Sequence, residues 1–227
     1  MDIDEQYVTH DTPSPVLLTS RAFYLPIRRT VMKTVIIKYN AGNVQSVMYA
    51  LDRLGASYLL TDDEAEIRSA DKVIFPGVGE ASTAMAYLRQ KGLDKLIPTL
   101  KQPVLGTCVG MQLMCRHSEE NDTTCMGIFD IDVRRFPSQP GFKVPHTGWN
   151  SIHSLSGPLT EGLPENAYVY FVHSYGADVC AETTAVCEYV RPFSAMLQKD
   201  NFYAAQFHAE ISGNVGQRIL ENFLKLS

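Results

Sequence analysis

The pattern of hydrophobic and polar residues changes abruptly at Met32. Before this residue no clear period appears, and after it short apolar runs typical of buried strands alternate with stretches at helical spacing. The predicted strands are 32–39, 57–60, 72–75 and 103–105, and the predicted helices are 44–54, 64–69, 81–91, 93–100 and 111–117. This alternation predicts a mostly parallel central sheet with helices on both faces.

From about Gly127 the pattern becomes rich in strands. The predicted strands are 128–136, 149–153, 168–174, 184–189, 194–198 and 202–207, and an amphipathic helix over 216–225 closes the chain. The turn Lys199-Asp-Asn201 suits a hairpin between the last two strands. We therefore expect residues 32–227 to form one three-layer α/β domain with an added antiparallel, strand-rich part.

The first 31 residues differ from the rest in composition. They contain none of the 15 glycines but three of the 12 prolines. We expect an N-terminal extension that is disordered, or upstream codons read into the product from a misplaced start, with a partner-binding arm as a further alternative.

Composition and charge narrow the class of protein. The chain of 227 residues is 45% hydrophobic and 20% charged, with 20 Lys and Arg against 25 Asp and Glu. No basic block stands out, which argues against a nucleic-acid partner because phosphates are neutralised by clustered Lys and Arg. The acidic start and the lack of a long apolar run argue against a signal peptide and a membrane span, so we expect a soluble, cytoplasmic protein.

The cysteines point away from disulfides and metal. There are five of them, an odd number without a CxxC pair, which disfavours a disulfide framework and a zinc site. We therefore predict no metal site and no cofactor.

One cysteine lies in a distinctive pentapeptide, Gly106-Thr-Cys108-Val-Gly110, between a predicted strand and a predicted helix. This is the form of a nucleophile elbow, in which flanking glycines permit a strained turn and expose the nucleophile. The helix N-terminus favours negative charge on the thiol, and the N–H of Val109 is placed to stabilise an oxyanion. A buried cysteine in a glycine-rich turn is the structural alternative.

A cysteine nucleophile needs a base. Among six histidines, His208 ends a predicted strand and is followed two residues later by Glu210, so strand alternation would put both side chains on one side. Pro76-Gly-Val78-Gly79, a turn after a buried strand, offers Val78 as a second oxyanion donor. His117 is expected on the helix after the elbow.

Together these pieces resemble the class I, triad-type glutamine amidotransferases, which have a flavodoxin-like fold. The resemblance covers residues 32–227. Within the family, the chain most resembles the glutaminase subunits of imidazole glycerol phosphate synthase, an enzyme of histidine biosynthesis. The segments that carry the narrower match are 33–43, 127–136, Pro145-His-Thr-Gly-Trp-Asn150 and Tyr170-Phe-Val-His-Ser-Tyr175.

The resemblance implies a function and a set of roles. Cys108 would be the nucleophile, His208 the base and then the acid, and Glu210 the orienting carboxylate. The remaining implied residues hold L-glutamine: Gln112, Glu120, His173, Ser174 and Tyr175. The implied partner is a (β/α)8 cyclase subunit that receives ammonia and forms imidazole glycerol phosphate and AICAR.

The chain departs from the usual family pattern near the triad. The late motif commonly reads Phe-His-Pro-Glu-Lys-Ser, whereas Ala209 and Ile211 stand here in place of Pro and Lys. Lys38 and Asn40 also depart from a stretch that often reads Asp-Tyr-Gly. The triad survives these changes, while the loop geometry and a contact to the cyclase are open.

Three other interpretations remain at this stage. The chain could be the glutaminase subunit of anthranilate, aminodeoxychorismate or pyridoxal phosphate synthesis. It could be a catalytically silent scaffold subunit, against which the intact triad argues. It could also be a cysteine peptidase or hydrolase with a similar elbow.

Overall fold

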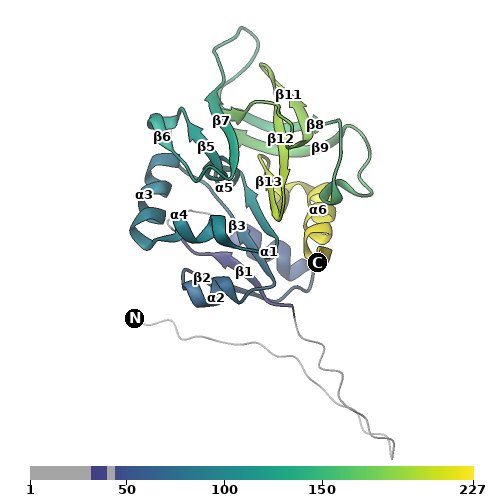
Figure 1. The fold of residues 1–227 in the computed structure, drawn as a ribbon. Helices are drawn as coiled ribbons and strands as arrows, with labels where there is room; N and C mark the ends of the chain where they lie inside the picture. Colours follow the sequence, from purple (N-terminus) through teal and green to yellow (C-terminus); the bar gives the residue numbers. More distant parts are fainter. Residues whose placement is uncertain (1–31, 40–43) are drawn as a thin grey trace, which may run out of the picture. The chain divides into compact units, whose positions relative to one another are not determined.

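The computed structural model describes residues 32–39 and 44–227, so the predictions for residues 1–31 and for Asn40 lie outside the described residues. A seven-stranded sheet with the order β11-β12-β13-β4-β3-β1-β2 forms its centre (Figure 1). Its strands are β1 (Thr34–Ile37), β2 (Tyr58–Thr61), β3 (Lys72–Phe75), β4 (Val104–Thr107), β11 (Thr183–Glu188), β12 (Pro192–Lys199) and β13 (Phe202–Ala205). The strands from β13 to β2 are parallel, whereas β12 and β11 are antiparallel additions, which confirms the predicted α/β class.

Helices cover both faces of this sheet. They are α1 (Val44–Arg53), α2 (Glu64–Arg68), α3 (Ala81–Lys91), α4 (Leu93–Leu96), α5 (Val109–Met114) and α6 (Gly213–Lys225). The helix predicted over residues 93–100 is shorter than expected, because after Leu96 it tightens into a 3₁₀ turn (Ile97–Thr99) at Pro98, which has no N–H to donate.

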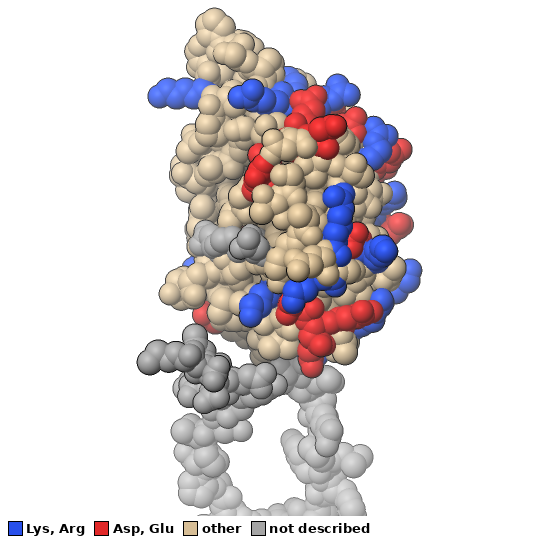
Figure 2. All heavy atoms as spheres, turned by 90° about the vertical axis from the view of Figure 1, so that its left-hand side faces the viewer, with Lys and Arg blue, Asp and Glu red and all other residues tan. Residues whose placement is uncertain are grey.

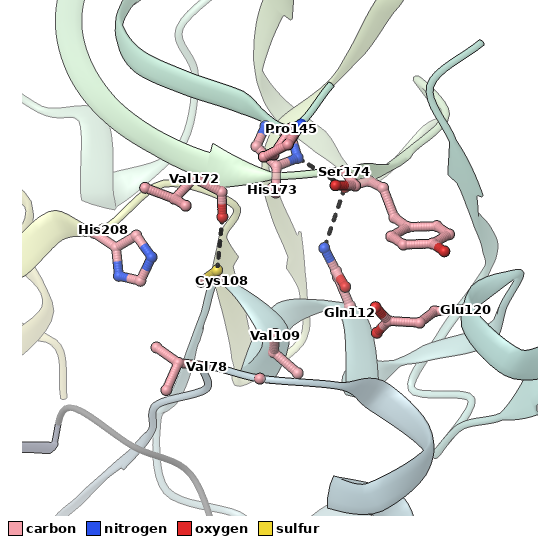
Figure 3. A pocket seen from close by; sticks show the side chains of 12 residues that line it. Val78, Cys108, Val109, Gln112, Glu120, Pro145, Val172, His173, Ser174 and His208 are labelled. Carbon is pink, nitrogen blue, oxygen red and sulfur yellow. Dashed lines mark hydrogen bonds between the residues drawn. The ribbon is translucent and has the colours of Figure 1, made fainter. Parts of the chain in front are cut away.

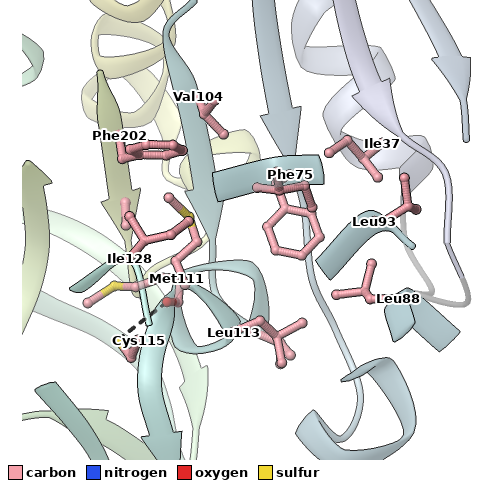
Figure 4. Packing of buried hydrophobic residues seen from close by; sticks show 14 of the residues in the cluster. Ile37, Phe75, Leu88, Leu93, Val104, Met111, Leu113, Cys115, Ile128 and Phe202 are labelled. Carbon is pink, nitrogen blue, oxygen red and sulfur yellow. Dashed lines mark hydrogen bonds between the residues drawn. The ribbon is translucent and has the colours of Figure 1, made fainter. Parts of the chain in front are cut away.

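Side-chain alternation along the strands divides the core into two clusters. Ile36, Ile74 and Leu105 point to the face covered by α1 and α6. Their strand neighbours, among them Phe75 and Val104, pack on the opposite face with residues of α2 to α5 (Figure 4). The sheet is therefore buried on both sides, as its near-continuous apolar strands predict.

Two smaller sheets stand beside the central one. The first has the order β10-β7-β5-β6, with β5 (Cys115–Ser118), β6 (Thr123–Thr124), β7 (Phe129–Arg135) and β10 (Tyr175–Ala177). The second is the hairpin of β8 (His146–Ile152) and β9 (Ala167–His173). The helix predicted over 111–117 was wrong at its end: residues from Cys115 onward pair with β7, so tertiary pairing overrides the local pattern and His117 lies on a strand.

Charge on the surface is mixed. Figure 2 shows Lys and Arg interspersed with Asp and Glu on the face that it presents. Opposite charges pair on the surface, as Lys91 does with Asp62 at 2.9 Å. Within the described ranges, no helix has the length and apolarity needed to cross a bilayer.

Candidate active site

Cys108 stands at the sharp turn between β4 and α5. Its φ of 51° lies in the left-handed region, and its N–H is held by the carbonyl oxygen of Ala205 at 2.8 Å. Neighbouring atoms come so close to the backbone at Gly106 and Gly110 that neither position has room for a side chain. A Cβ on Gly106 would lie 2.4 Å from the Met114 sulfur, and one on Gly110 would lie 2.1 Å from the carbonyl oxygen of Phe75. The predicted strand–elbow–helix geometry is present.

His208 and Glu210 meet as predicted, but for a different reason. His208 Nδ1 lies 2.7 Å from Glu210 Oε1, and both side chains are almost fully buried. β13 ends at Ala205, however, and Glu210 belongs to a 3₁₀ turn (Ala209–Ile211), so the strand alternation that we invoked does not apply. The tight turn, rather than a strand, brings the carboxylate back to the imidazole.

The electrostatics of this cluster favour a protonated imidazole. Burial by itself lowers the pKa of His208, but Cys108 and Glu210 more than offset this effect and raise it to about 10. Figure 3 shows the His208 ring beside the Cys108 sulfur, with both residues lining one pocket. Because Glu210 occupies Nδ1, the other ring nitrogen of His208 is available to exchange a proton with the thiol.

A serine that the sequence reasoning missed anchors the triad turn. Ser212 Oγ donates to the carbonyl oxygen of His208 at 2.6 Å and accepts from the N–H of Tyr170 at 2.9 Å. The N–H of His208 donates in turn to the carbonyl oxygen of Tyr170 at 3.0 Å. These bonds fix the turn to β9 although Ala209 lacks the rigid φ of proline.

The predicted glutamine-site residues line the same pocket, which has a volume of about 270 Å³ (Figure 3). Its lining consists of Val78, Gly79, Cys108, Val109, Gln112, Glu120, Pro145, Val172, His173, Ser174, Tyr175 and His208. Every residue named for the site thus lines the pocket except Glu210, which contacts His208.

Two buried glutamines connect this pocket to the nucleophile. Gln112 Nε2 donates to the carbonyl oxygen of Tyr175 and to Gln206 Oε1, at 3.1 Å each, so its own amide oxygen remains as an acceptor. Gln206 Nε2 lies 4.0 Å from the sulfur of Cys108. Gln206 was not predicted, although its position two residues before His208 was a usable signal.

Glu120 supplies negative charge at the pocket and also supports a helix. Its Oε2 accepts from the N–H of Ala81, the first residue of α3, at 2.7 Å. The half-buried carboxylate therefore has a fixed orientation, and its other oxygen remains for a cation in the pocket.

The predicted oxyanion donors are not both free in this structure. The N–H of Val109 is engaged by the carbonyl oxygen of Gly77 at 3.3 Å, so the turn itself fills the position of an oxyanion. The turn is anchored by Tyr39, whose hydroxyl donates to the carbonyl oxygen of Pro76 at 2.6 Å. Burial, with a smaller contribution from Cys108, raises the pKa of Tyr39 well above its usual range, so the hydroxyl stays a donor.

The other four cysteines are free thiols of a different kind. Burial raises the pKa of Cys115 strongly, and those of Cys125 and Cys187 to about 12, and it also raises that of Cys180. In the part of the chain that the structure describes, no three His, Cys, Asp or Glu side chains are grouped as metal ligands.

Comparison with known proteins agrees with this geometry. Residues 35–226 match the family model of class-I glutamine amidotransferase. The chain is 57% identical to an imidazole glycerol phosphate synthase subunit HisH from Bacteroides thetaiotaomicron, over 86% of this chain and 100% of the relative. It is 45% identical to a HisH subunit from Shewanella sediminis, over 85% and 90%.

A solved glutamine amidotransferase has the same fold. Its TM-score is 0.64 at 18% identity, with 84% of this chain and 97% of that chain covered. The nucleophile elbow, the His–Glu pair and these matches lead to one conclusion. The chain belongs to the class-I glutamine amidotransferase family and, within it, to the HisH subunits.

Proposed function

We propose that this chain is the glutaminase subunit of imidazole glycerol phosphate synthase and hydrolyses L-glutamine to glutamate and ammonia. The observation that carries the proposal is the arrangement around His208: Glu210 lies 2.7 Å from one ring nitrogen and Cys108 lies in the same pocket. This is the geometry of a nucleophile, a base and an orienting group. The HisH relatives support the assignment to histidine biosynthesis.

The reaction follows from these positions. The thiolate of Cys108 attacks the side-chain amide carbon of glutamine, and the C–N bond breaks as His208 gives its proton to the amide nitrogen, which leaves as ammonia. The resulting thioester is then attacked by water, from which His208 removes a proton, and glutamate leaves as the C–S bond breaks. Gln112 presents its free amide oxygen, and Glu120 a carboxylate, to the α-ammonium end of the substrate.

The carbonyl oxygen of Gly77 occupies the position in which an oxyanion would bind, and this supports a resting state with low activity. If the Gly77–Val78 peptide rotates, the carbonyl oxygen leaves Val109 and the N–H of Val78 turns inward, which completes a pair of donors. Oxyanion donors are typically worth about 3–4 kcal/mol in the transition state. We propose that binding of the cyclase with its substrate favours the rotated state.

Exposed apolar side chains next to the pocket support the partner assignment. On the outer face of the β8–β9 hairpin, Trp149 and Tyr168 are 54% and 60% exposed, and Val172 is 41% exposed at the pocket edge. Ile211, 41% exposed, adds an apolar group in the triad turn where the family usually has Lys. Exposed apolar groups of this kind mark interaction surfaces. We propose that this face docks on a (β/α)8 cyclase to form a cytoplasmic heterodimer.

The test is glutamate release by the chain, with and without the cyclase and its nucleotide substrate. Cys108→Ala should abolish turnover and labelling by a glutamine-analogue affinity reagent, whereas Cys125→Ala should preserve both. Full activity of the Cys108→Ala variant would refute the triad. Hydrolysis by the isolated chain at the full rate of the complex would refute the resting state, and stimulation only by the partner of another glutaminase would refute the pathway.

A further inference from the structure

Two buried histidines outside the triad are in direct contact. His146 on β8 and His173 on β9 are paired in register, are 3% and 6% exposed, and their Nδ1 and Nε2 atoms lie 3.0 Å apart. The His146 ring is stacked between Phe171 and Tyr189, with ring centroids 4.7 and 3.8 Å away. Only His173 lines the pocket. The proposed reaction assigns no role to His146.

The neighbours of this pair determine where every proton lies. His173 Nδ1 is 2.7 Å from the carbonyl oxygen of Tyr175, which can only accept, so Nδ1 carries the proton and Nε2 accepts from His146 Nδ1. His146 Nε2 must then accept, and it faces Asn150 Nδ2 at 3.4 Å. The Asn150 amide is oriented independently, because its Oδ1 accepts from the N–H of Ser151 at 2.8 Å.

This directed chain of hydrogen bonds ends at the glutamine site. The carbonyl oxygen of Tyr175 accepts from His173 and also from Gln112, whose second N–H is bound by Gln206. Both N–H groups of Gln112 are thus committed, and only its oxygen is left for the substrate. If the His173 ring turned away, the carbonyl oxygen of Tyr175 would lose one of its two donors, and the orientation of Gln112 would be less well fixed.

We propose that His146 is a positioning residue for the glutamine site: by donating to His173 Nε2 it holds the segment from His173 to Tyr175, and through it Gln112, in the orientation that binds substrate. The proposal rests on the glutaminase function proposed above. It assigns His146 no contact with glutamine and no proton transfer.

The charge state of the pair fits this role. Burial lowers the pKa of His146 to about 4, and burial is also the largest of the causes that lower the pKa of His173 to about 3. The titratable and charged groups that act on His173 are His146, His208 and Arg191, and all three oppose its protonation. Because the His146 N–H occupies the remaining lone pair of His173, no second positive charge arises beside the triad imidazole.

The first test needs no activity. In the full chain labelled with ¹⁵N-histidine, NMR should show a scalar coupling across the hydrogen bond between His146 Nδ1 and His173 Nε2, with the proton on His146. A proton on His173 Nε2, or the absence of the coupling, would overturn the proposal. A chain without glutaminase activity that still shows the coupling would refute the proposed function but not the hydrogen bond between His146 and His173.

The second test is kinetic and uses the complex with the cyclase. His146→Phe keeps a ring between Phe171 and Tyr189 without its nitrogens, and we expect the KM for glutamine to rise about tenfold, as for one lost hydrogen bond. His146→Asn, whose amide nitrogen takes the place of Nδ1, should restore most of the affinity. His153→Phe, at a half-buried histidine that does not line the pocket, is the matched control.

Comparing the change in KM with the change in kcat distinguishes a positioning role of His146 from a general structural defect. A positioning role predicts that kcat stays within about twofold of wild type in both His146 variants. An unchanged KM in His146→Phe, or equal losses in the Phe and Asn variants, would overturn the proposal. If the Phe variant fails to fold, the Asn variant and the wild-type coupling still decide the question.

Discussion

Replacing Glu210 by Gln removes one charge from the triad and keeps its shape. The amide oxygen can still accept from His208 Nδ1, since Glu210 Oε1 makes that bond at 2.7 Å and Oε2 has no partner among the described residues. A hydrogen bond to a charged group is worth about 1.5–3 kcal/mol and one between neutral groups about 0.5–1.5 kcal/mol, so removing the charge costs about 1–1.5 kcal/mol, a loss of about 5- to 13-fold in kcat. The buried site, with both side chains less than a tenth exposed, places the expectation in the upper part of this range.

The pH profile gives this prediction a definite sign. Glu210 contributes to raising the pKa of His208 to about 10, so its neutralisation moves that pKa down towards 6.5. The imidazolium that protonates the leaving amide nitrogen is then lost at lower pH, and the alkaline limb of kcat shifts to lower pH.

Steady-state glutamate release in the stimulated complex, from pH 6 to 10, measures both effects. Glu188→Gln is the matched control, because Glu188 faces His153 at 3.8 Å on the surface. A Glu210→Gln variant with wild-type kcat and an unmoved alkaline limb would refute the orienting role.

Three further predictions concern stability. Gly110→Ala places a Cβ 2.1 Å from the carbonyl oxygen of Phe75, and urea denaturation should show a loss of about 1–3 kcal/mol or more; an unchanged midpoint would contradict the close approach. Tyr39→Phe strips the buried carbonyl oxygen of Pro76 of its donor and should lower the free energy of unfolding by about 1–3 kcal/mol, with wild-type stability as the contrary result. The pKa of His208 is raised on folding, so protonated His208 adds to the free energy of unfolding. This contribution is full below pH 6.5 and is lost as the pH rises towards 10, so the difference in free energy of unfolding between wild type and His208→Asn should shrink over that window. A constant difference would count against the ion pair.

The sequence was sufficient for features that rest on local patterns. The apolar runs around Val35 and Ile74 predicted parallel strands, and the Gly106–Gly110 spacing predicted the elbow, because only a strained turn with close backbone contacts needs glycine at both positions. The pairing of His208 with Glu210 was predicted as well, but from a strand that ends too early to explain it.

Features that depend on distant partners were not accessible. The end of α5 at Met114 is decided by pairing of β5 with β7, and Gln206 reaches the site only because β13 lies beside β4. The hydrogen bond from Val109 to Gly77 is a choice between two orientations of one peptide, and no residue type encodes which one is adopted. Packing and register, rather than propensity, therefore set the fine geometry of the site.

The contrast among the five thiols has a practical consequence. Four of them have a pKa raised above its usual value and stay in the poorly nucleophilic protonated form, while Cys108 lines the same pocket as the His208 imidazole. A mild electrophile at neutral pH will therefore react first at the sulfur of Cys108. When this electrophile is added in excess and the reaction is stopped after the fast phase, the label bound per chain measures the fraction of competent catalytic centres in a purified sample.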